Sequence, residues 1–289
     1  MIILDRTYIK ELLPKRERNC NKGFFGKTLI IASCRSMSGA CVLATRAALR
    51  SGSGLTYAAS AESALLPLKV STPEAITLPL CENEDGAISF EAADFLIKKA
   101  NTMSAVVLGC GLSVCEDTKK LVTKLLSRIN VPVVLDADGI NILAQDINIL
   151  KNTSAPLVLT PHMKEFSRLS GLEVSYIKEN REKVASEFAQ KHGVILVLKD
   201  FETVVACKGR NLYRNVGGHP CMAKGGSGDM LAGMLGALIS QGLSAENAAC
   251  AAVFLHARAG EICGERMGER SVITTDLIET LPEVFKDFE

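Results

Sequence analysis

The sequence lacks an excess of charge of either sign. It contains 33 Lys and Arg residues and 32 Asp and Glu residues, which gives a formal net charge of +1 at neutral pH. Nucleic acid and anionic membranes are bound mainly through an excess of positive charge, so neither is expected as the main partner. A small anionic ligand remains compatible with this composition, because it needs only a local positive site.

Long hydrophobic runs and paired cysteines are also missing. No apolar run approaches the roughly 20 residues that span a bilayer, and the N-terminal stretch becomes charged too early for a signal peptide. The ten cysteines are irregularly spaced and contain no CxxC pair, which argues against a zinc site or a disulfide framework. Cys41, Cys207 and Cys250 lie in apolar runs, as small buried hydrophobes do. We therefore predict a cytoplasmic protein with reduced thiols.

Short β-branched runs alternate with longer helical stretches along most of the chain. Runs such as 105–110 and 194–200 are almost continuously apolar, which is typical of strands in a parallel sheet covered on both faces. A shorter pair of runs within 203–215 indicates an antiparallel hairpin. No linker and no internal repeat is visible. We predict one three-layer α/β domain over residues 1–289 with a mostly parallel central sheet, in which residues 1–21 are an N-terminal extension or helix.

Helical stretches fill the segments between these runs, and the last third of the chain is predicted to be helical. In the helix after the first run, Ser38 is a candidate N-cap, and the glycines at the far end are typical of a helix C-terminus. The other expected helices cover about 91–100, 116–128, 177–192, 229–241, 245–265 and a closing segment after Thr275.

Polar or glycine-rich turns follow five of the predicted strands. Ligands of open parallel sheets bind beyond the carboxyl ends of the strands. We therefore predict that these turns converge on a site. They are SCRSMSG (33–39), GCGLS (109–113), DADG (136–139), TPHMKEF (160–166) and KD (199–200).

The stretch GGSGDMLAGML, residues 225–235, places three glycines and a serine before an apolar helix. Free backbone N–H groups and the positive end of the helix dipole make an anion site there, and glycine lets a phosphate approach the backbone closely. Asp229 is either a favourable carboxylate at a helix start or a general base that removes a proton from a hydroxyl attacking a phosphoryl group. Behind four small residues in this layout, we favour the base.

This arrangement resembles the ribokinase-like kinases, which place a small-residue turn and a catalytic aspartate at the head of a helix. Six motifs in order narrow the resemblance to the ADP/ATP-dependent NAD(P)H-hydrate dehydratase family, over nearly the whole chain from about Lys22. The motifs are NKGFFGKTLIIAS, SGACVLATRAALRSGSGL, VVLDADGINIL, LVLTPHMKEF, VLK and GGHPCMAKGGSGDMLAGML. The resemblance implies repair of the (6S) hydrate of NADH or NADPH: ADP or ATP phosphorylates the C6 hydroxyl, phosphate is eliminated, and the reduced nicotinamide returns.

The resemblance also implies a set of site residues. Asp229 would be the base on the C6 hydroxyl. The anion hole would comprise Gly225, Gly226, Ser227 and Gly228, with Gly228 also near the nucleotide phosphate. The nucleotide segment falls on Lys199, Asp200, Phe201, Glu202 and Thr203, where the lysine can neutralise nucleotide phosphate. The hydrated dinucleotide (NADHX or NADPHX) would contact Ala40, Gly111, His162 and Asp229.

Two of these assignments keep a structural alternative. His162 is equally a loop histidine bonded to nearby backbone. Asp136 and Asp138 could hold Mg²⁺ indirectly, or Asp138 could cap the next helix while Asn141 supports the turn. We prefer the structural interpretation for Asp138, leave Asp136 open and assign no metal ligand.

Several residues depart from the pattern of the family. Ala32 and Ser33 stand in glycine places, Met37 stands where an aromatic residue is usual, Cys110 and Ser113 replace a proline and a glycine, and Lys224 replaces a threonine. Asp200 occupies the place of the glycine after the lysine. It puts a carboxylate beside the expected nucleotide phosphates, which weakens binding unless Lys199 or Lys224 offsets its charge.

Two other functions remain open. A ribokinase-like kinase acting on a small alcohol, such as a sugar or a vitamin precursor, would share Asp229 and the anion hole, although DADGINIL and TPHMKEF favour the dehydratase. A binding module that kept the fold and lost turnover is the third candidate. The apolar faces of the terminal helices predict a homo-oligomer, with a tetramer as one option. The family commonly carries an epimerase domain, which we expect a separate protein to supply.

Overall fold

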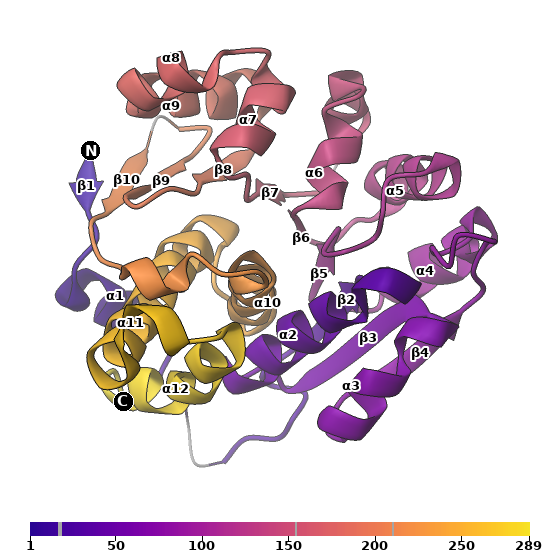
Figure 1. Ribbon diagram of the computed structural model, residues 1–289, viewed down its shortest axis with the longest axis horizontal. Coiled ribbons are helices and arrows are strands. Elements are labelled where there is room, and N and C mark those ends of the chain that lie inside the picture. Colours follow the sequence, from indigo (N-terminus) through magenta and orange to yellow (C-terminus); the bar gives the residue numbers. More distant parts are fainter. Residues whose placement is uncertain (17–18, 154, 210) are drawn as a thin grey trace.

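One ten-stranded sheet forms the centre of the molecule (Figure 1). The computed structural model describes residues 1–16, 19–153, 155–209 and 211–289. The strand order is β1-β10-β9-β8-β7-β6-β5-β2-β3-β4. Neighbouring strands are parallel except where β9 meets β8 and β10. The strands are β1 (Ile2–Ile3), β2 (Lys27–Ile31), β3 (Leu55–Ala61), β4 (Ile76–Leu80), β5 (Ala105–Leu108), β6 (Val133–Leu135), β7 (Leu157–Leu159), β8 (Ile195–Leu198), β9 (Thr203–Ala206) and β10 (Leu212–Asn215).

Helices cover both faces of this sheet, so the predicted three-layer α/β architecture is confirmed (Figure 1). Successive strand residues point to opposite faces, which divides the core in two: Val107 packs in one cluster and its neighbour Val106 in the other. The first cluster includes residues of α1 (Arg6–Leu12), α2 (Ser38–Arg50), α3 (Leu66–Ser71), α10 (Ser227–Ser240), α11 (Ala245–Ser271) and α12 (Thr274–Lys286). The second includes residues of α4 (Ala93–Ala100), α5 (Glu116–Arg128), α6 (Asp138–Leu143), α7 (Met163–Ser170), α8 (Val174–Glu179) and α9 (Arg181–His192).

Several of the predicted helix boundaries are wrong; α11, for example, ends at Ser271 and not at residue 265. The helix expected over 177–192 is two helices, because the chain leaves helical geometry at Asn180 between α8 and α9. Ser38 is not an N-cap: a 3-10 turn over Arg35–Met37 already places it in the first turn of α2. The hydroxyl that accepts a hydrogen bond at this helix start belongs to Ser33, which receives the N–H of Cys41 at 2.8 Å. The helix expected from residue 229 begins two residues earlier, at Ser227.

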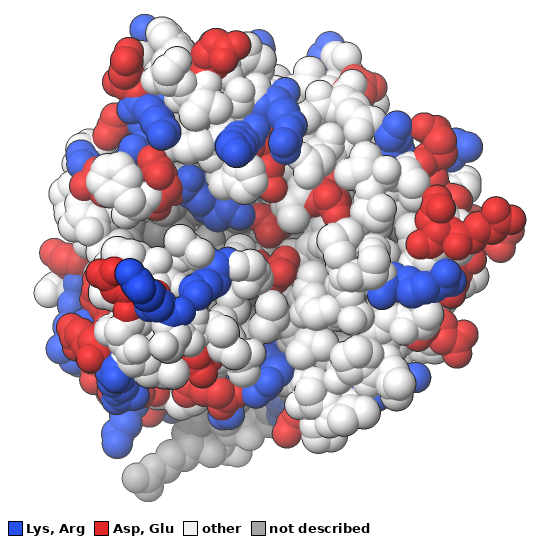
Figure 2. Space-filling model, viewed as in Figure 1, with Lys and Arg blue, Asp and Glu red and all other residues white. Residues whose placement is uncertain are grey.

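The terminal helices bury their apolar faces within the chain. Leu277, Ile278, Leu281 and Val284 of α12 are fully buried in the first core cluster. The apolar faces from which we predicted a homo-oligomer are therefore not exposed, and the oligomer itself stays a prediction. Across the described part of the chain, no helix combines the length and the apolar character that crossing a membrane requires. Basic and acidic side chains are mixed over the face shown in Figure 2.

Glycines bring α10 unusually close to its neighbours. A Cβ built on Gly233 would lie 2.1 Å from the carbonyl oxygen of Ala44 in α2, and one built on Gly236 would lie 2.4 Å from Cγ2 of Val107 in β5. Such distances are far below van der Waals contact, so only glycine permits this packing. The close approach fixes where the N-terminus of α10 lies relative to the strand ends.

Two serines that replace family glycines keep a left-handed backbone. Ser33 has φ 69° and Ser113 has φ 67°. Residues with a side chain rarely adopt this region, because Cβ crowds the following carbonyl. A left-handed backbone at both places agrees with the glycines that the family resemblance implies there.

Replacing Ser113 with glycine is expected to stabilise the protein by about 0.5–1 kcal/mol. The relief of left-handed strain, about 1–2 kcal/mol, exceeds the added freedom of glycine in the unfolded chain. The Ser113 hydroxyl makes no hydrogen bond to another described residue, whereas that of Ser33 donates to the Met37 carbonyl at 2.8 Å. Ser33→Gly is therefore the comparison, expected to destabilise. Urea midpoints measure both changes, and a lower midpoint for Ser113→Gly would contradict the strain argument.

Candidate active site

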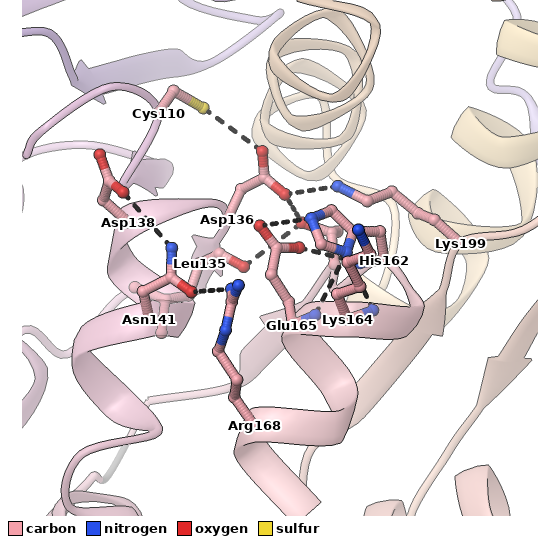
Figure 3. A network of polar contacts seen from close by, with 11 residues as sticks. Cys110, Leu135, Asp136, Asp138, Asn141, His162, Lys164, Glu165, Arg168 and Lys199 are labelled. Carbon is pink, nitrogen blue, oxygen red and sulfur yellow. Dashed lines mark hydrogen bonds and ion pairs between the residues drawn. The ribbon is translucent and has the colours of Figure 1, made fainter. Parts of the chain in front are cut away.

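Asp136, directly after β6, is the centre of a polar cluster at the carboxyl ends of the strands (Figure 3). The residue is 1% exposed. Its Oδ1 accepts hydrogen bonds from Lys199 Nζ at 2.8 Å and from Thr160 Oγ1 at 2.6 Å. The thiol of Cys110 lies 3.7 Å from its Oδ2. The turns after β5, β6, β7 and β8 therefore do converge, as the sequence predicts.

The predicted anion turn forms the N-terminus of α10 beside this cluster. Gly226 is the N-cap with φ 90°, and Ser227, Gly228 and Asp229 occupy the first turn. The N–H groups of Gly228 and Asp229 donate to no acceptor within the described ranges. A Cβ on Gly228 would lie 3.1 Å from Nζ of Lys199. Free N–H groups, a helix N-terminus and a lysine ammonium together make a site for a phosphoryl group.

Side chains from the C-terminal helices support this turn. Thr274, the first residue of α12, donates its hydroxyl to the carbonyl of Gly225 at 2.8 Å. His256 of α11 places Nε2 3.1 Å from the hydroxyl of Ser227. These two contacts hold the turn in place while the N–H groups of Gly228 and Asp229 stay available.

Asp229 carries a carboxyl group suited to proton transfer. Burial raises its pKa to about 7, and the negative charge of Asp136 acts in the same direction, while the thiol of Cys110 and the charge of Lys199 oppose them. The ligand atoms of Asp229, Asp136 and Cys110 all lie within 4.8 Å of one another. A carboxylate with a pKa near neutrality is basic enough to accept a proton and is still partly ionised. The position of Asp229 and its raised pKa are therefore compatible with proton transfer.

His162 lies in the same cluster, but its contacts are those of a helix cap. Nδ1 accepts the N–H groups of Lys164 at 3.1 Å and Glu165 at 3.2 Å, and Glu165 Oε2 accepts the His162 N–H at 2.9 Å. Burial lowers the pKa of His162, although the carboxylate of Glu165 opposes the shift. The described contacts are therefore those of the loop-histidine alternative, and contact with a ligand stays a prediction (Figure 3).

Ala40 and Gly111 lie against each other, next to Cys110. A Cβ on Gly111 would lie 2.9 Å from Cβ of Ala40 and 3.1 Å from Cβ of Met37. The start of α2 therefore packs directly on the turn after β5. The resemblance alone named these two residues as contacts of the hydrate, and the structure brings them together at one edge of the cluster.

Only the first residue of the predicted nucleotide segment pairs with the cluster. Beyond Lys199, the Asp200 carboxylate accepts a hydrogen bond from Arg181 Nη2 at 2.8 Å. Glu202 pairs with Arg214, and the Thr203 hydroxyl donates to the Asp200 carbonyl at 3.2 Å. Phe201 is 74% exposed.

Neither Lys199 nor Lys224, the two lysines considered as possible partners of Asp200, pairs with it in the structure. The turn after β8 directs Asp200 toward α9, where Arg181 neutralises it. Lys199 binds Asp136, and Lys224 donates to the carbonyl of Arg270 at 2.9 Å. The negative charge of Asp200 is thus paired with Arg181, a partner that lies on a different element and that no local pattern indicated.

The contacts of Asp138 are with neighbouring loop and helix residues, and it does not cap its own helix. Ala137 is the N-cap of α6, and Asp138 lies in the first turn. Its Oδ2 accepts the N–H of Ser113 at 2.9 Å, and its Oδ1 accepts from Asn141 Nδ2 at 3.4 Å. Figure 3 shows this pair apart from Asp136, continuing to Arg168.

Three site residues were missed by sequence reasoning: Cys110, Thr160 and His256. Cys110 was noted only as a departure from the family pattern. Thr160 directly follows β7, so its place at a strand end was the available signal. His256 lies far along the chain from the turn that it contacts, and no local pattern indicated the pairing.

A family model for NAD(P)H-hydrate dehydratase matches residues 28–283. The chain belongs to this family. It is 37% identical over 287 residues to the bifunctional NAD(P)H-hydrate repair enzyme of Moorella thermoacetica, covering 99% of this chain and 54% of the relative. It is 31% identical over 283 residues to the ADP-dependent (S)-NAD(P)H-hydrate dehydratase of Bacillus subtilis, covering 98% and 97%. The chain thus spans about half the length of the bifunctional relatives.

A solved dehydratase has the same fold. The ADP/ATP-dependent NAD(P)H-hydrate dehydratase from B. subtilis, co-crystallised with ATP/Mg²⁺, superposes with a TM-score of 0.85 at 28% identity, covering 100% of this chain and 99% of that one. The family resemblance and the ribokinase-like fold predicted from the motifs are therefore confirmed.

Proposed function

We propose that this dehydratase-family chain uses ADP or ATP to return the (6S) hydrate of NADH or NADPH to NADH or NADPH. The observation that carries the proposal is Asp229, a carboxyl group with a pKa of about 7 in the first turn of α10, beside N–H groups free to bind an anion. The full-length match to an ADP-dependent dehydratase supports the same conclusion.

The geometry suggests how the chain's own groups act. Asp229 takes the proton of the C6 hydroxyl as that oxygen attacks the terminal phosphoryl group of the nucleotide. The O–P bond forms while the bond to the leaving nucleotide breaks, and the N–H groups around Gly228 stabilise the charge on the phosphoryl oxygens. Breaking the C6–O bond then releases phosphate, and loss of a proton from the neighbouring carbon restores the ring double bond.

We propose the site residues as the resemblance implies them. Lys199 and Gly228 are adjacent, which supports their placement at the nucleotide phosphate. The anion hole would be Gly225 to Gly228, and Asp200, Phe201, Glu202 and Thr203 would border the rest of the nucleotide. Contact between Ala40 and Gly111 supports a shared role in binding the hydrate, with His162 across the cluster.

Magnesium would enter this site with the nucleotide. Mg²⁺ prefers carboxylate oxygens and phosphate together. Asp136 fits that need, because only its Oδ1 is engaged by Lys199 and Thr160. The other carboxylate oxygen, Oδ2, has only the thiol of Cys110 as a hydrogen-bond partner among the described residues. Of these two groups, the carboxylate is the one that suits Mg²⁺, since a thiol is a poor ligand for this ion. Bound there, Mg²⁺ would neutralise charge on the phosphate oxygens.

The predictions of a single domain, a cytoplasmic location and a homo-oligomer concern the chain as a whole. We propose that residues 1–289 form a single domain, since one sheet connects the described strands from β1 to β10. Ten free cysteines agree with a cytoplasmic location. Size-exclusion chromatography with light scattering would test the homo-oligomer.

Absorbance at 340 nm tests the reaction itself. Protein is mixed with NADH hydrate, magnesium and either ADP or ATP. A rise that requires nucleotide establishes the repair reaction and identifies the phosphoryl donor. A flat trace from protein that still binds nucleotide would contradict the proposal, and small alcohols would then be tested as kinase substrates.

The value of kcat/KM is expected to rise with pH and to level off above about pH 7. Only the ionised form of Asp229 accepts a proton, and its pKa lies at about 7, so protonation removes the base at lower pH. The profile of kcat/KM between pH 5.5 and 9 measures this rise, which is the acidic limb of the pH profile. In Asp136→Asn the neighbouring negative charge is gone, and the limb should move to lower pH. A rate independent of pH across this range would contradict the assignment.

A further inference from the structure

Ser227 and His256 form a contact that the mechanism above does not use. Ser227 is the first residue of α10, between the glycines of the anion turn. Its hydroxyl lies 3.1 Å from Nε2 of His256, which comes from the middle of α11. The histidine is half-buried. A hydroxyl in this place either adds a donor to the anion hole or presents lone pairs to it, and the two outcomes have opposite effects on phosphate.

The tautomer of His256 decides between these outcomes. Burial lowers the pKa of His256 to about 4, and the charge of Lys199 acts in the same direction, so the ring is neutral and has one donor and one acceptor nitrogen. If Nε2 carries the proton, the ring donates to the Ser227 oxygen and the serine proton stays free. If Nδ1 carries it, the serine donates to the ring and its proton is no longer available.

The surroundings favour a proton on Nε2. Among the described residues, the ring has one hydrogen-bond partner, the Ser227 hydroxyl at Nε2, so a proton on Nδ1 would be left without an acceptor. A proton on Nε2 instead has the Ser227 oxygen as its acceptor at 3.1 Å, so the nitrogen that faces Ser227 is the donor. The same tautomer avoids directing serine lone pairs at a bound anion.

We propose that His256 is a positioning residue that donates to Ser227 and thereby directs the serine hydroxyl as a side-chain donor to the transferred phosphoryl group. The identity of that group rests on the proposed function. The tautomer does not, because it is a property of the free protein.

Nitrogen NMR of the ring tests the proposal without substrate. Long-range ¹H–¹⁵N spectra of ¹⁵N-histidine-labelled protein distinguish the two neutral tautomers, and His256→Gln assigns the signals among the four histidines. The expected result is a neutral ring with the proton on Nε2, which shifts in Ser227→Ala. A proton on Nδ1 would overturn the proposal, whether or not the chain proves to be a dehydratase.

Kinetics then test the role in turnover. Removal of one oxyanion-hole donor typically lowers kcat by about 10²–10³. The Ser227 hydroxyl is neutral and shares this role with backbone N–H groups, so its effect should be smaller. We expect Ser227→Ala and His256→Leu each to lower kcat by about 10- to 100-fold and to change the KM for nucleotide by less than about threefold. His256→Gln retains an N–H donor and should recover most of the rate.

A double mutant distinguishes positioning from a general structural role. If His256 acts through Ser227, combining Ser227→Ala with His256→Leu is no slower than Ser227→Ala alone. The proposal would be overturned if the double mutant lost kcat by the product of the two single-mutant losses, or if the variants changed KM alone. His192→Leu is the matched control, since this histidine packs on Phe188 in the other core cluster and should leave the rate unchanged. If the wild type shows no turnover, the proposed function fails, and the NMR result still decides the positioning claim.

Discussion

Replacing Asp229 with asparagine is expected to lower kcat of the dehydration by about 10²–10⁴-fold while the fold is retained. Asparagine has the volume of aspartate and suits a helix start, so packing at the head of α10 is preserved. It cannot accept the proton of the C6 hydroxyl. The rate at 340 nm and the affinity for a fluorescent nucleotide analogue measure the two effects separately.

The same variant is expected to be more stable than the wild type at pH 8. The pKa of Asp229 is about 7 in the folded protein and 3.8 in its ordinary state, so between these values the folded chain binds more protons than the unfolded chain. Stability contributed by this group is therefore present at about pH 4 and lost as the pH rises through 7. Asparagine avoids that loss, so its melting temperature should exceed that of the wild type at pH 8 and match it near pH 4.

Asp138→Asn is the matched control for Asp229→Asn. It also removes a carboxylate near the cluster but retains an oxygen to accept the N–H of Ser113. We expect its rate to stay within about tenfold of the wild type, because Asp138 takes no part in proton transfer. Near-normal turnover in Asp229→Asn would refute the general-base assignment.

Replacing Gly233 with alanine is expected to destabilise the protein by about 3 kcal/mol or more. The added Cβ would lie 2.1 Å from the carbonyl oxygen of Ala44 and 2.8 Å from its carbonyl carbon. Both atoms belong to the backbone of α2, so no side-chain rotation relieves the clash. The two helices must separate, and α10 carries the anion turn, so the remaining folded protein should also be less active.

Urea unfolding of Gly233→Ala and Gly39→Ala tests this packing. Gly39 lies in the first turn of α2, and a Cβ built on it has no atom within 4 Å. Alanine there should be neutral or stabilising by up to about 1 kcal/mol, because it favours the helix. Opposite shifts for the same substitution would show that contact with α2, and not glycine content, determines the result. A loss below about 1 kcal/mol in Gly233→Ala would contradict the packing argument.

Local patterns predicted much of the fold. The predicted helix over 116–128 is α5 with the same bounds, and the hairpin within 203–215 is β9 with β10. The failures occur where local signals are weak or compete. Strand β4 (Ile76–Leu80) contains Pro79 and was not predicted, since proline is unusual inside a strand unless it lies at an edge, as here. The break at Asn180 has no glycine or proline to announce it.

The anion turn illustrates what sequence determines. Gly225, Gly226, Ser227 and Gly228 before an apolar helix specify a helix N-terminus with accessible N–H groups, because these properties arise within a few consecutive residues. The position of Asp229 in that first turn follows from the same local rule. Membership of the dehydratase family was likewise visible in the order of the motifs.

Only the tertiary structure decided how the charges pair and how strongly Asp229 holds its proton. Asp200 binds Arg181, Lys199 binds Asp136, and Asp136 lies beside Asp229. These partners come from different strands and helices, and no local pattern relates them. A pKa is set by burial and by neighbouring charges. Neither exists until the parallel sheet brings its strand ends together beneath α10.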